Sequence, residues 1–200
     1  MNHSVFNTTH QQMDVASKIV VGLERISEVF KVLLWEHGKS VGLSPIQIQI
    51  LIFIAYHKYE FCNVSHLALE FNVSKPTISD AVKILDSKKL IVKDFSAHDK
   101  RRYSIQLSDD GRKIVSQTEN FANPIKSQLS NIEELDSFYN LLSTLIYKLH
   151  TTGLLSVQRL CYSCKFYDKN EGGHYCNLLE KPLYTNDIRL DCPEFTKASS

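Results

Sequence analysis

The residues with the clearest chemistry are the cysteines, because four of the five lie in the last forty of the 200 residues. Cys161, Cys164, Cys176 and Cys192 follow the spacing C-x2-C-x11-C-x15-C. Four thiolates can complete a tetrahedral zinc site or hold an iron–sulfur cluster. Disulfides are rare in the reducing cytosol, so clustered cysteines in a cytosolic chain indicate metal ligands or redox groups.

The spacing of these cysteines favours a cluster over a single ion. A structural zinc site usually takes two close pairs of ligands, whereas this segment has one pair and two single cysteines on separate turns. Cys192 precedes Pro193, as ferredoxin-type ligands often precede proline. We therefore expect a [4Fe–4S] cluster, with zinc as the alternative. The nearby aromatic residues that could exclude water are Tyr162, Phe166, Tyr167, Tyr175, Tyr184 and Phe195.

The cysteine segment is too short to build much of a core, so a bound metal must supply folding energy. Its layout resembles the small high-potential iron–sulfur folds. We expect His174, two residues before Cys176, to lie at the surface or behind the ligands rather than to be a ligand. The segment follows closely after a helix, which predicts that it packs on that helix.

Two segments carry the narrow apolar seam of paired helices. Residues 13–35 place apolar side chains at alternating steps of four and three, and we expect the helix to end near Gly38. A second seam runs from Leu135 to Leu149, after a capping box at Ser130–Glu133 and before a stop at Gly153. These seams predict helices that pair two copies of the chain.

The middle of the chain predicts a helix-turn-helix. Ser44 and Gln47 form a capping box, so we assign a helix to the run that follows, although "IQIQI" alternates like a strand. Residues 63–71 predict a short helix, "NVS" a tight turn, and residues 75–88 a second helix with one apolar face.

A β-hairpin follows the second of these helices. "LIVKDF" and "YSIQL" predict two strands around the basic loop "SAHDKRR", and Ser108 begins another helix, which Pro124 should end or kink. Residues 75–113 hold ten basic and six acidic residues, a net charge of +4, while the whole chain is only +1. The basic charge is therefore concentrated around the hairpin and the helix before it.

This arrangement predicts a DNA-reading surface. The outer face of the second helix offers Lys75, Thr77, Ser79 and Lys83 to base edges and phosphates of a major groove. The wing offers Lys100, Arg101 and Arg102, which can enter the neighbouring minor groove. A symmetric dimer would place two such helices about 34 Å apart and read an inverted repeat in double-stranded DNA.

Residues 64–114 resemble the MarR family of winged helix-turn-helix regulators. The wing pattern of that family is matched by Asp99, Arg101, Leu107, Ser108 and Gly111, and the helix order extends the likeness over about residues 10–152. The resemblance implies a homodimer with interlocking terminal helices, Arg101 as the wing arginine, and Asp99 as the residue that orients the wing. It also implies that a small aromatic effector is possible, although no residue identifies one.

We therefore expect a mainly α-helical winged helix-turn-helix domain with dimerising terminal helices over residues 1–153, and a small irregular cysteine-ligated metal module over residues 154–200. The expected function is a cytoplasmic, non-enzymatic regulator, a repressor, whose cluster senses redox state, a gas or iron. The alternative is a regulator with a structural zinc tail and a small aromatic effector. No signal peptide or membrane span is expected, and Cys62 should be a buried apolar residue.

Overall fold

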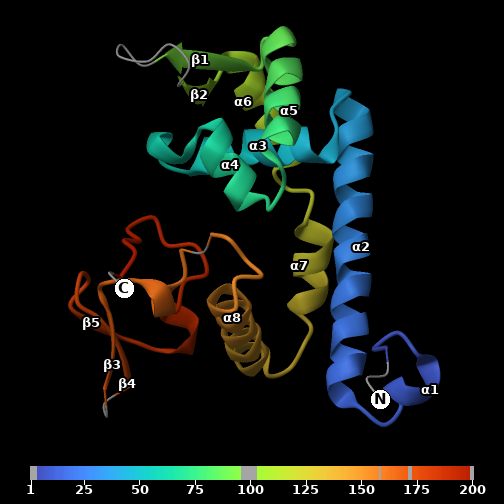
Figure 1. The fold of residues 1–200 in the computed structure, drawn as a ribbon, viewed down its shortest axis with the longest axis vertical. Coiled ribbons are helices and arrows are strands. Elements are labelled where there is room, and N and C mark those ends of the chain that lie inside the picture. Colours follow the sequence, from blue (N-terminus) through green and yellow to red (C-terminus); the bar gives the residue numbers. More distant parts are fainter. Residues whose placement is uncertain (1–3, 96–102, 158, 171–172, 199–200) are drawn as a thin grey trace.

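The computed structural model describes residues 4–95, 103–157, 159–170 and 173–198. A long helix, α2 (Val15–Val41), forms one side of the molecule, after the short α1 (Thr8–Gln11). Figure 1 shows a lobe at one end of α2 and the C-terminal segment beside α8 at the other. Asp14 caps the start of α2, and Gly42 ends it in the left-handed conformation with φ 66°.

The lobe holds a helix-turn-helix and a wing. Its helices and strands are α3 (Pro45–Tyr56), η1 (Tyr59–Phe61), α4 (Val64–Glu70), α5 (Lys75–Ser87), β1 (Ile91–Phe95), β2 (Tyr103–Leu107) and α6 (Asp109–Thr118). The two strands pair antiparallel, from Ile91 with Leu107 to Phe95 with Tyr103. The expected helix-turn-helix and hairpin are confirmed.

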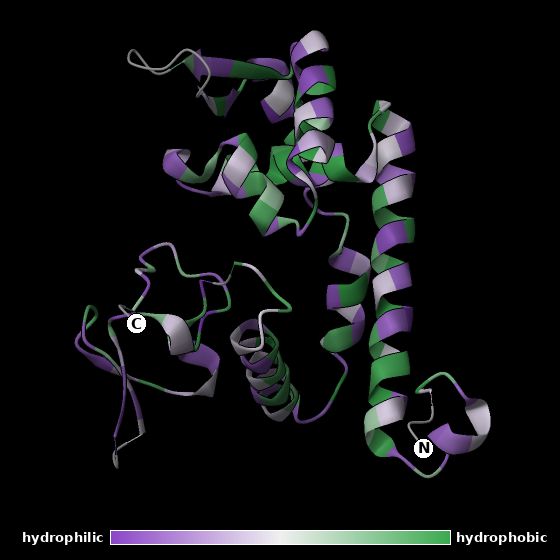
Figure 2. Ribbon diagram, in the orientation of Figure 1, coloured by the Kyte–Doolittle hydropathy of each residue, from purple (hydrophilic) through white to green (hydrophobic). Residues whose placement is uncertain are grey.

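Helix α3 forms the centre of the lobe. The Ser44–Gln47 capping box is present at its start, so the helix assignment of "IQIQI" is confirmed. Ile48, Ile50 and Leu51 are all fully buried, and at about 100° per residue they lie on different sides of α3, so the helix is buried on more than one side. A helix surrounded by other elements needs no polar face, and this explains why its sequence shows no helical period. Figure 2 shows the apolar colour of α3 at the middle of the lobe.

The helices after the lobe depart from the expected boundaries. Helix α6 ends at Thr118, and Pro124 lies in the first turn of α7 (Asn123–Leu129), where proline's missing N–H costs nothing. The expected capping box at Ser130–Glu133 is wrong. Helix α8 (Leu135–Thr151) starts instead after Glu134, which has φ 57° and gives no side-chain cap. Gly153, with φ 78°, follows its end as expected.

The C-terminal segment forms a small module with its own core. It contains η2 (Cys161–Ser163), η3 (Thr185–Asp187), and a three-stranded antiparallel sheet of β3 (Tyr167–Asn170), β4 (Gly173–Cys176) and β5 (Lys181–Leu183). Leu160, Leu183 and Ile188 are buried together against Tyr139 and Tyr147 of α8. The Tyr139 hydroxyl also donates a hydrogen bond to the Ile188 carbonyl. Packing of this module on the last seam helix is confirmed.

Within the described residues, no single helix is long and apolar enough to cross a membrane. Helices α2 and α3 reach that length and composition only when they are taken as a pair, with a bend of 88° between them.

Candidate functional site

Helix α5 is positioned to present its outer face to a partner. Its inner face is buried in the lobe through Ile78, Ala81, Val82 and Leu85. Ser74 caps the helix by accepting a hydrogen bond from the Thr77 N–H at 3.3 Å. The spacing of the buried residues therefore orients the opposite face outward, as the helical period predicts.

The polar residues expected on α5 divide by exposure. Lys75, Thr77 and Lys83 are exposed, whereas Ser79 is half-buried. The Thr77 hydroxyl lies 2.8 Å from the Ser74 hydroxyl, and the Lys83 ammonium lies 2.9 Å from the Asp80 carboxylate. The Lys83–Asp80 pair is well exposed, so it holds the ammonium only weakly and leaves it available to a phosphate.

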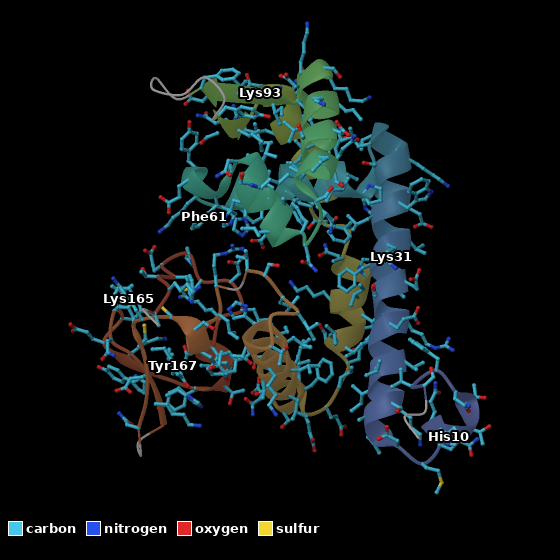
Figure 3. All side chains as sticks on the ribbon, in the orientation of Figure 1. His10, Lys31, Phe61, Lys93, Lys165 and Tyr167 are labelled. Atoms are coloured by element: carbon cyan, nitrogen blue, oxygen red, sulfur yellow. The ribbon has the colours of Figure 1, made fainter. Side chains whose placement is uncertain are left out.

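The wing is fastened to the rest of the lobe at its base. Lys93 of β1 forms an ion pair with Asp86 of α5 at 2.6 Å, and Figure 3 labels Lys93 beside that helix. The Tyr59 hydroxyl donates to Asp94 at 2.5 Å, which joins η1 to the same strand. The expected wing residues Asp99, Lys100, Arg101 and Arg102 lie outside the described residues.

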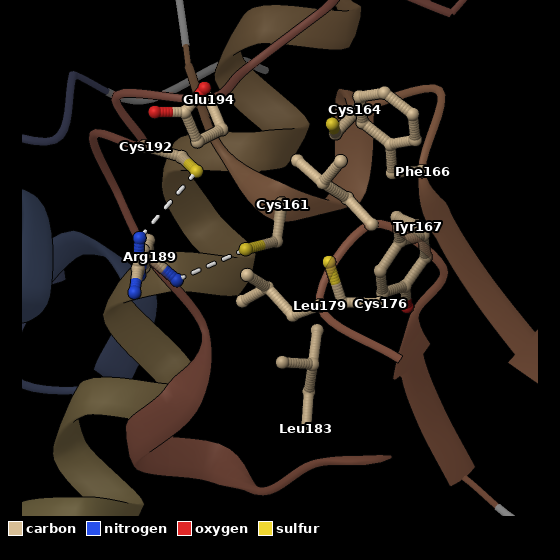
Figure 4. Close-up of a pocket in the computed structure, with 11 residues that line it drawn as sticks. Cys161, Cys164, Phe166, Tyr167, Cys176, Leu179, Leu183, Arg189, Cys192 and Glu194 are labelled. Carbon is tan, nitrogen blue, oxygen red and sulfur yellow. Dashed lines mark hydrogen bonds between the residues drawn. The ribbon is translucent and has the colours of Figure 1, made fainter. Parts of the chain in front are cut away.

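The C-terminal module brings four cysteines to one pocket. Cys161, Cys164, Cys176 and Cys192 all line it, and all are free thiols. Figure 4 shows their sulfur atoms around this space, with Leu179, Leu183 and Phe166 among the walls. The cavity has a volume of about 30 Å³, roughly twice the ~15 Å³ that one water molecule requires.

Hydrogen-bond donors point at two of these sulfurs. The Arg189 backbone N–H lies 3.2 Å from Cys161 Sγ, and Arg189 Nη1 lies 3.9 Å from Cys192 Sγ. Burial raises the pKa of the Cys161 thiol, and the other three cysteines raise it further, although the Arg189 N–H opposes the shift. The Cys161 thiol therefore resists ionisation unless a cation binds beside it.

Aromatic residues form the wall between the cysteines and α8. Tyr162 lies edge-on to Tyr147 of α8 and to Tyr167, each with ring centroids 5.5 Å apart. Burial raises the pKa of Tyr167 to about 12, and its hydroxyl lies 2.6 Å from His174 Nδ1. Tyr184, in contrast, is exposed.

No three His, Cys, Asp or Glu side chains within the described residues are close enough together to hold one metal ion.

A buried arginine that the sequence reasoning missed joins the module to the lobe. Arg159 donates to both carboxylate oxygens of Glu70 on α4 at 2.9 Å, and also to Asp191. Asp191 in turn lies 2.7 Å from His57 at the end of α3. The signal available in the sequence was position, because Arg159 is two residues before Cys161 and Asp191 directly precedes Cys192.

Hydrogen bonds between Arg159 and its partners stabilise the charged forms of Arg159 and Asp191. Burial alone would lower the pKa of Arg159, but hydrogen bonds to Glu70 and Asp191 raise it above its usual range. Burial alone would raise the pKa of Asp191, but hydrogen bonds from His57 and Arg159 hold it well below its usual range. Both partners therefore remain charged at neutral pH.

Cys62 is buried in the lobe with 1% exposure, as expected for an apolar residue. Desolvation raises its thiol pKa to about 11, which keeps it protonated and unreactive at neutral pH.

A large apolar surface remains open on the long helices. The exposed apolar residues of α2 are Val15, Ile19, Val20, Leu23, Ile26, Val29, Phe30, Val32 and Trp35, and those at the start of α8 are Leu135, Phe138 and Leu141. Soluble monomers rarely leave so many large apolar side chains exposed on their helices. We call these residues the apolar helix face.

The order of α4, turn, α5 and hairpin defines a winged helix-turn-helix fold. The family model described as the MarR family matches residues 41–102, from the end of α2 to the wing. No curated protein matches the chain.

Several solved structures share this fold. S. aureus MepR in DNA-binding conformation superposes with a TM-score of 0.58 at 21% identity, covering 67% of this chain and 97% of MepR. A MarR transcriptional regulator from Methanosarcina mazei gives a TM-score of 0.58 at 14% identity, covering 67% and 97%. CouR from Rhodococcus jostii RHA1 bound to p-coumaroyl-CoA gives 0.52 at 14%, covering 76% and 92%. At these identities the likeness establishes the fold.

Proposed function

We propose that this protein is a transcriptional regulator that binds double-stranded DNA through α5. The observation that carries the proposal is the exposed outer face of α5, with Lys75, Thr77 and Lys83, on a helix whose inner face is fully packed. A rigid helix with hydroxyl and ammonium groups outward can enter a major groove and contact bases and phosphates. The DNA-binding conformation described for MepR, which has the same fold, supports this assignment.

We propose further that the protein acts as a homodimer through the apolar helix face. Covering this face with a second copy removes apolar side chains from water and orders two α5 helices symmetrically. Two helices spaced by about one turn of DNA, about 34 Å, would read an inverted repeat. Lys100, Arg101 and Arg102 would contact the neighbouring minor groove, with Asp99 orienting the wing loop.

The four cysteines are proposed to hold a [4Fe–4S] cluster. Four free thiols that line one pocket with apolar walls, and N–H donors aimed at two of the sulfurs, support this proposal, because such clusters are held by four cysteine thiolates that accept hydrogen bonds. When bound, the cluster would supply sensitivity to oxidation, to reactive gases and to iron supply. The residues themselves exclude water, through Tyr162 and Tyr167, and orient the thiols. Zinc is the alternative, and it would require these sulfurs to lie closer together than they do in the structure.

The metal is tested by an absorption spectrum of protein purified without oxygen, with iron, sulfide and zinc assayed on the same sample. A brown protein with a broad band near ~400 nm and about four irons and four sulfides per chain supports the cluster. A colourless protein with about one zinc per chain refutes the cluster and supports the alternative. Cys176→Ser should lower the bound metal in either case.

DNA binding is tested by selecting binders from random duplex DNA with the metal-loaded protein. An inverted repeat should be enriched, and Lys75→Ala and Lys83→Ala should weaken its binding. Lys181→Ala is the matched control, because this lysine also pairs with an aspartate but lies in the C-terminal module. If no duplex is enriched above background, the proposal fails.

A small-molecule effector is a second possibility, and one cleft favours it. An open cleft of about 570 Å³ lies between α3, β2 and α6 and is lined by Tyr56, Arg112 and Glu119 among others, within the ~300–1,000 Å³ typical of ligand pockets. Arg112 supplies a cation there, which pairs with the exposed Asp109 at 2.7 Å. We expect an aromatic carboxylate to bind by replacing Asp109 as the partner of Arg112, since an exposed pair of this kind is weak. Calorimetry with such acids should show binding that Arg112→Gln removes, and equal binding to both proteins would reject this site.

A further inference from the structure

We propose that Arg159 couples the metal state of the four-cysteine module to the helix-turn-helix, through its buried ion pair with Glu70. This inference rests on the proposed function and names how the module would regulate DNA binding. We call Arg159, Glu70, Asp191 and His57 the arginine latch. The lobe supplies Glu70 and His57, and the module supplies Arg159 and Asp191.

The module end of the latch lies in the two segments next to Cys161 and Cys192. Arg159 and Asp191 form an isolated parallel β-bridge. The Cys192 N–H donates to the Arg159 carbonyl at 3.0 Å, and the Cys161 N–H donates to the Arg189 carbonyl at 3.1 Å. Any group that holds Cys161 and Cys192 together therefore also keeps Arg159 and Asp191 side by side.

The lobe end of the latch lies at the entry to α5. Glu70 is the last residue of α4, and Ser74 caps α5 only four residues later. Between them, Asn72 adopts φ 52°, and its side chain accepts a hydrogen bond from Ser156 at 3.2 Å. The chain between α8 and the cysteines thus contacts both the end of α4 and the turn of the helix-turn-helix.

The guanidinium of Arg159 is held in one position by its hydrogen bonds and by two aromatic rings. The Arg159 side chain is only 7% exposed and donates to both Glu70 oxygens. Its guanidinium carbon also lies 5.5 Å from the ring centre of Phe53 and 5.8 Å from that of Phe61, and Figure 3 shows Phe61 on the side of the lobe that faces the module. A planar cation packed between rings and carboxylates has a single well-defined position.

The closed latch favours one arrangement of α4, the turn and α5. If the metal is lost, the small module loses its main source of folding energy and its strands separate. Asp191 then no longer supports Arg159, and Glu70 loses its bidentate partner. The end of α4 and the turn become free to move, so α5 is no longer held at one angle. We therefore expect metal-loaded protein to bind its operator more tightly than metal-free protein.

The test removes the ion pair between Arg159 and Glu70 by a substitution in the lobe, and it leaves the residues of the module unchanged. Glu70→Gln removes the carboxylate from α4, while Arg159 keeps Asp191 as its counter-charge, so the variant should fold. The matched control is Lys58→Gln, which removes the exposed Lys58–Glu194 pair across the same boundary. Each protein is prepared metal-loaded and chelator-treated, and iron and zinc are assayed before binding to the selected operator.

In the wild type and in Lys58→Gln, metal removal should weaken operator binding by about 5- to 150-fold, the usual range of allosteric coupling. Glu70→Gln should bind the same amount of metal, yet its loaded and metal-free forms should differ by no more than about twofold. If Glu70→Gln keeps the full metal-dependent difference, or the wild type shows none, the coupling role of Arg159 is wrong.

Hydrogen exchange separates failure of this inference from failure of the proposed function. Amides of residues 64–73 should exchange faster after metal removal in the wild type, and at one fast rate with or without metal in Glu70→Gln. This readout needs no DNA, so it tests the latch even if no operator is found. A wild type that binds no metal would refute the metal proposal and the latch together, because there would be no metal state to transmit.

Discussion

The apolar helix face makes a quantitative prediction through Ile26. This side chain is 45% exposed in the single chain, so a partner copy can still cover nearly half of it. Full burial of an isoleucine contributes about 2–3 kcal/mol, so the part left for the dimer contributes about 1 kcal/mol per chain. Symmetry doubles this value, and Ile26→Ala should weaken the dimer by about 2 kcal/mol, or about 30-fold in Kd.

The dimer constant is measured by sedimentation or mass photometry over a dilution series, with circular dichroism to check the fold. Alanine favours helix more than isoleucine does, so any weakening comes from the lost contact and not from the helix itself. Val92→Ala is the matched control, because Val92 is 55% exposed but lies on β1 of the wing. An unchanged dimer constant for Ile26→Ala, or equal weakening by Val92→Ala, would refute the assignment of this face to the dimer.

Three further predictions concern the lobe. Gly111→Ala should lower the free energy of unfolding by about 1–3 kcal/mol in urea titrations, because the added Cβ would lie 2.0 Å from the Leu90 carbonyl oxygen; unchanged stability would contradict that approach. Lys83→Ala should reduce the slope of log affinity against log salt by about 1 if this lysine contacts a phosphate, and an unchanged slope would remove it from the interface. Burial lowers the pKa of His66, the charges of Arg159 and His57 lower it further, and Glu70 opposes the shift. As the pH is lowered past about 6.5, the unfolded chain therefore binds a proton at His66 before the folded chain does. The free energy of unfolding should then decrease by at most about 1.4 kcal/mol per pH unit. His66→Phe, which keeps the stacking on Phe61, should flatten this fall below about pH 6.5 in unfolding titrations. His57 has a raised pKa, so its contribution to stability is lost only above about pH 6.5, and an equally steep fall in the variant would reject the assignment.

Much of the lobe could be read from short stretches of sequence. The Ser44–Gln47 box identified the start of α3, and the spacing of Ile78, Val82 and Leu85 identified the buried face of α5. Such signals act within one or two helical turns, so they survive whatever the rest of the chain does. The start of α8 was misplaced because "SNIE" fits a capping box, while the chain turns at Glu134 through a positive φ that no local pattern required.

The sequence by itself determined the winged helix-turn-helix order, the polar face of α5 and the grouping of four cysteines, because each depends on residues close together or on a repeating period. Only the tertiary structure decided what Arg159 does. Its partners Glu70 and His57 are 89 and 102 positions away, and no periodicity connects an arginine beside a cysteine to the end of α4. A buried ion pair is defined by which surfaces meet, and that follows from the packing of the module on α8 and the lobe.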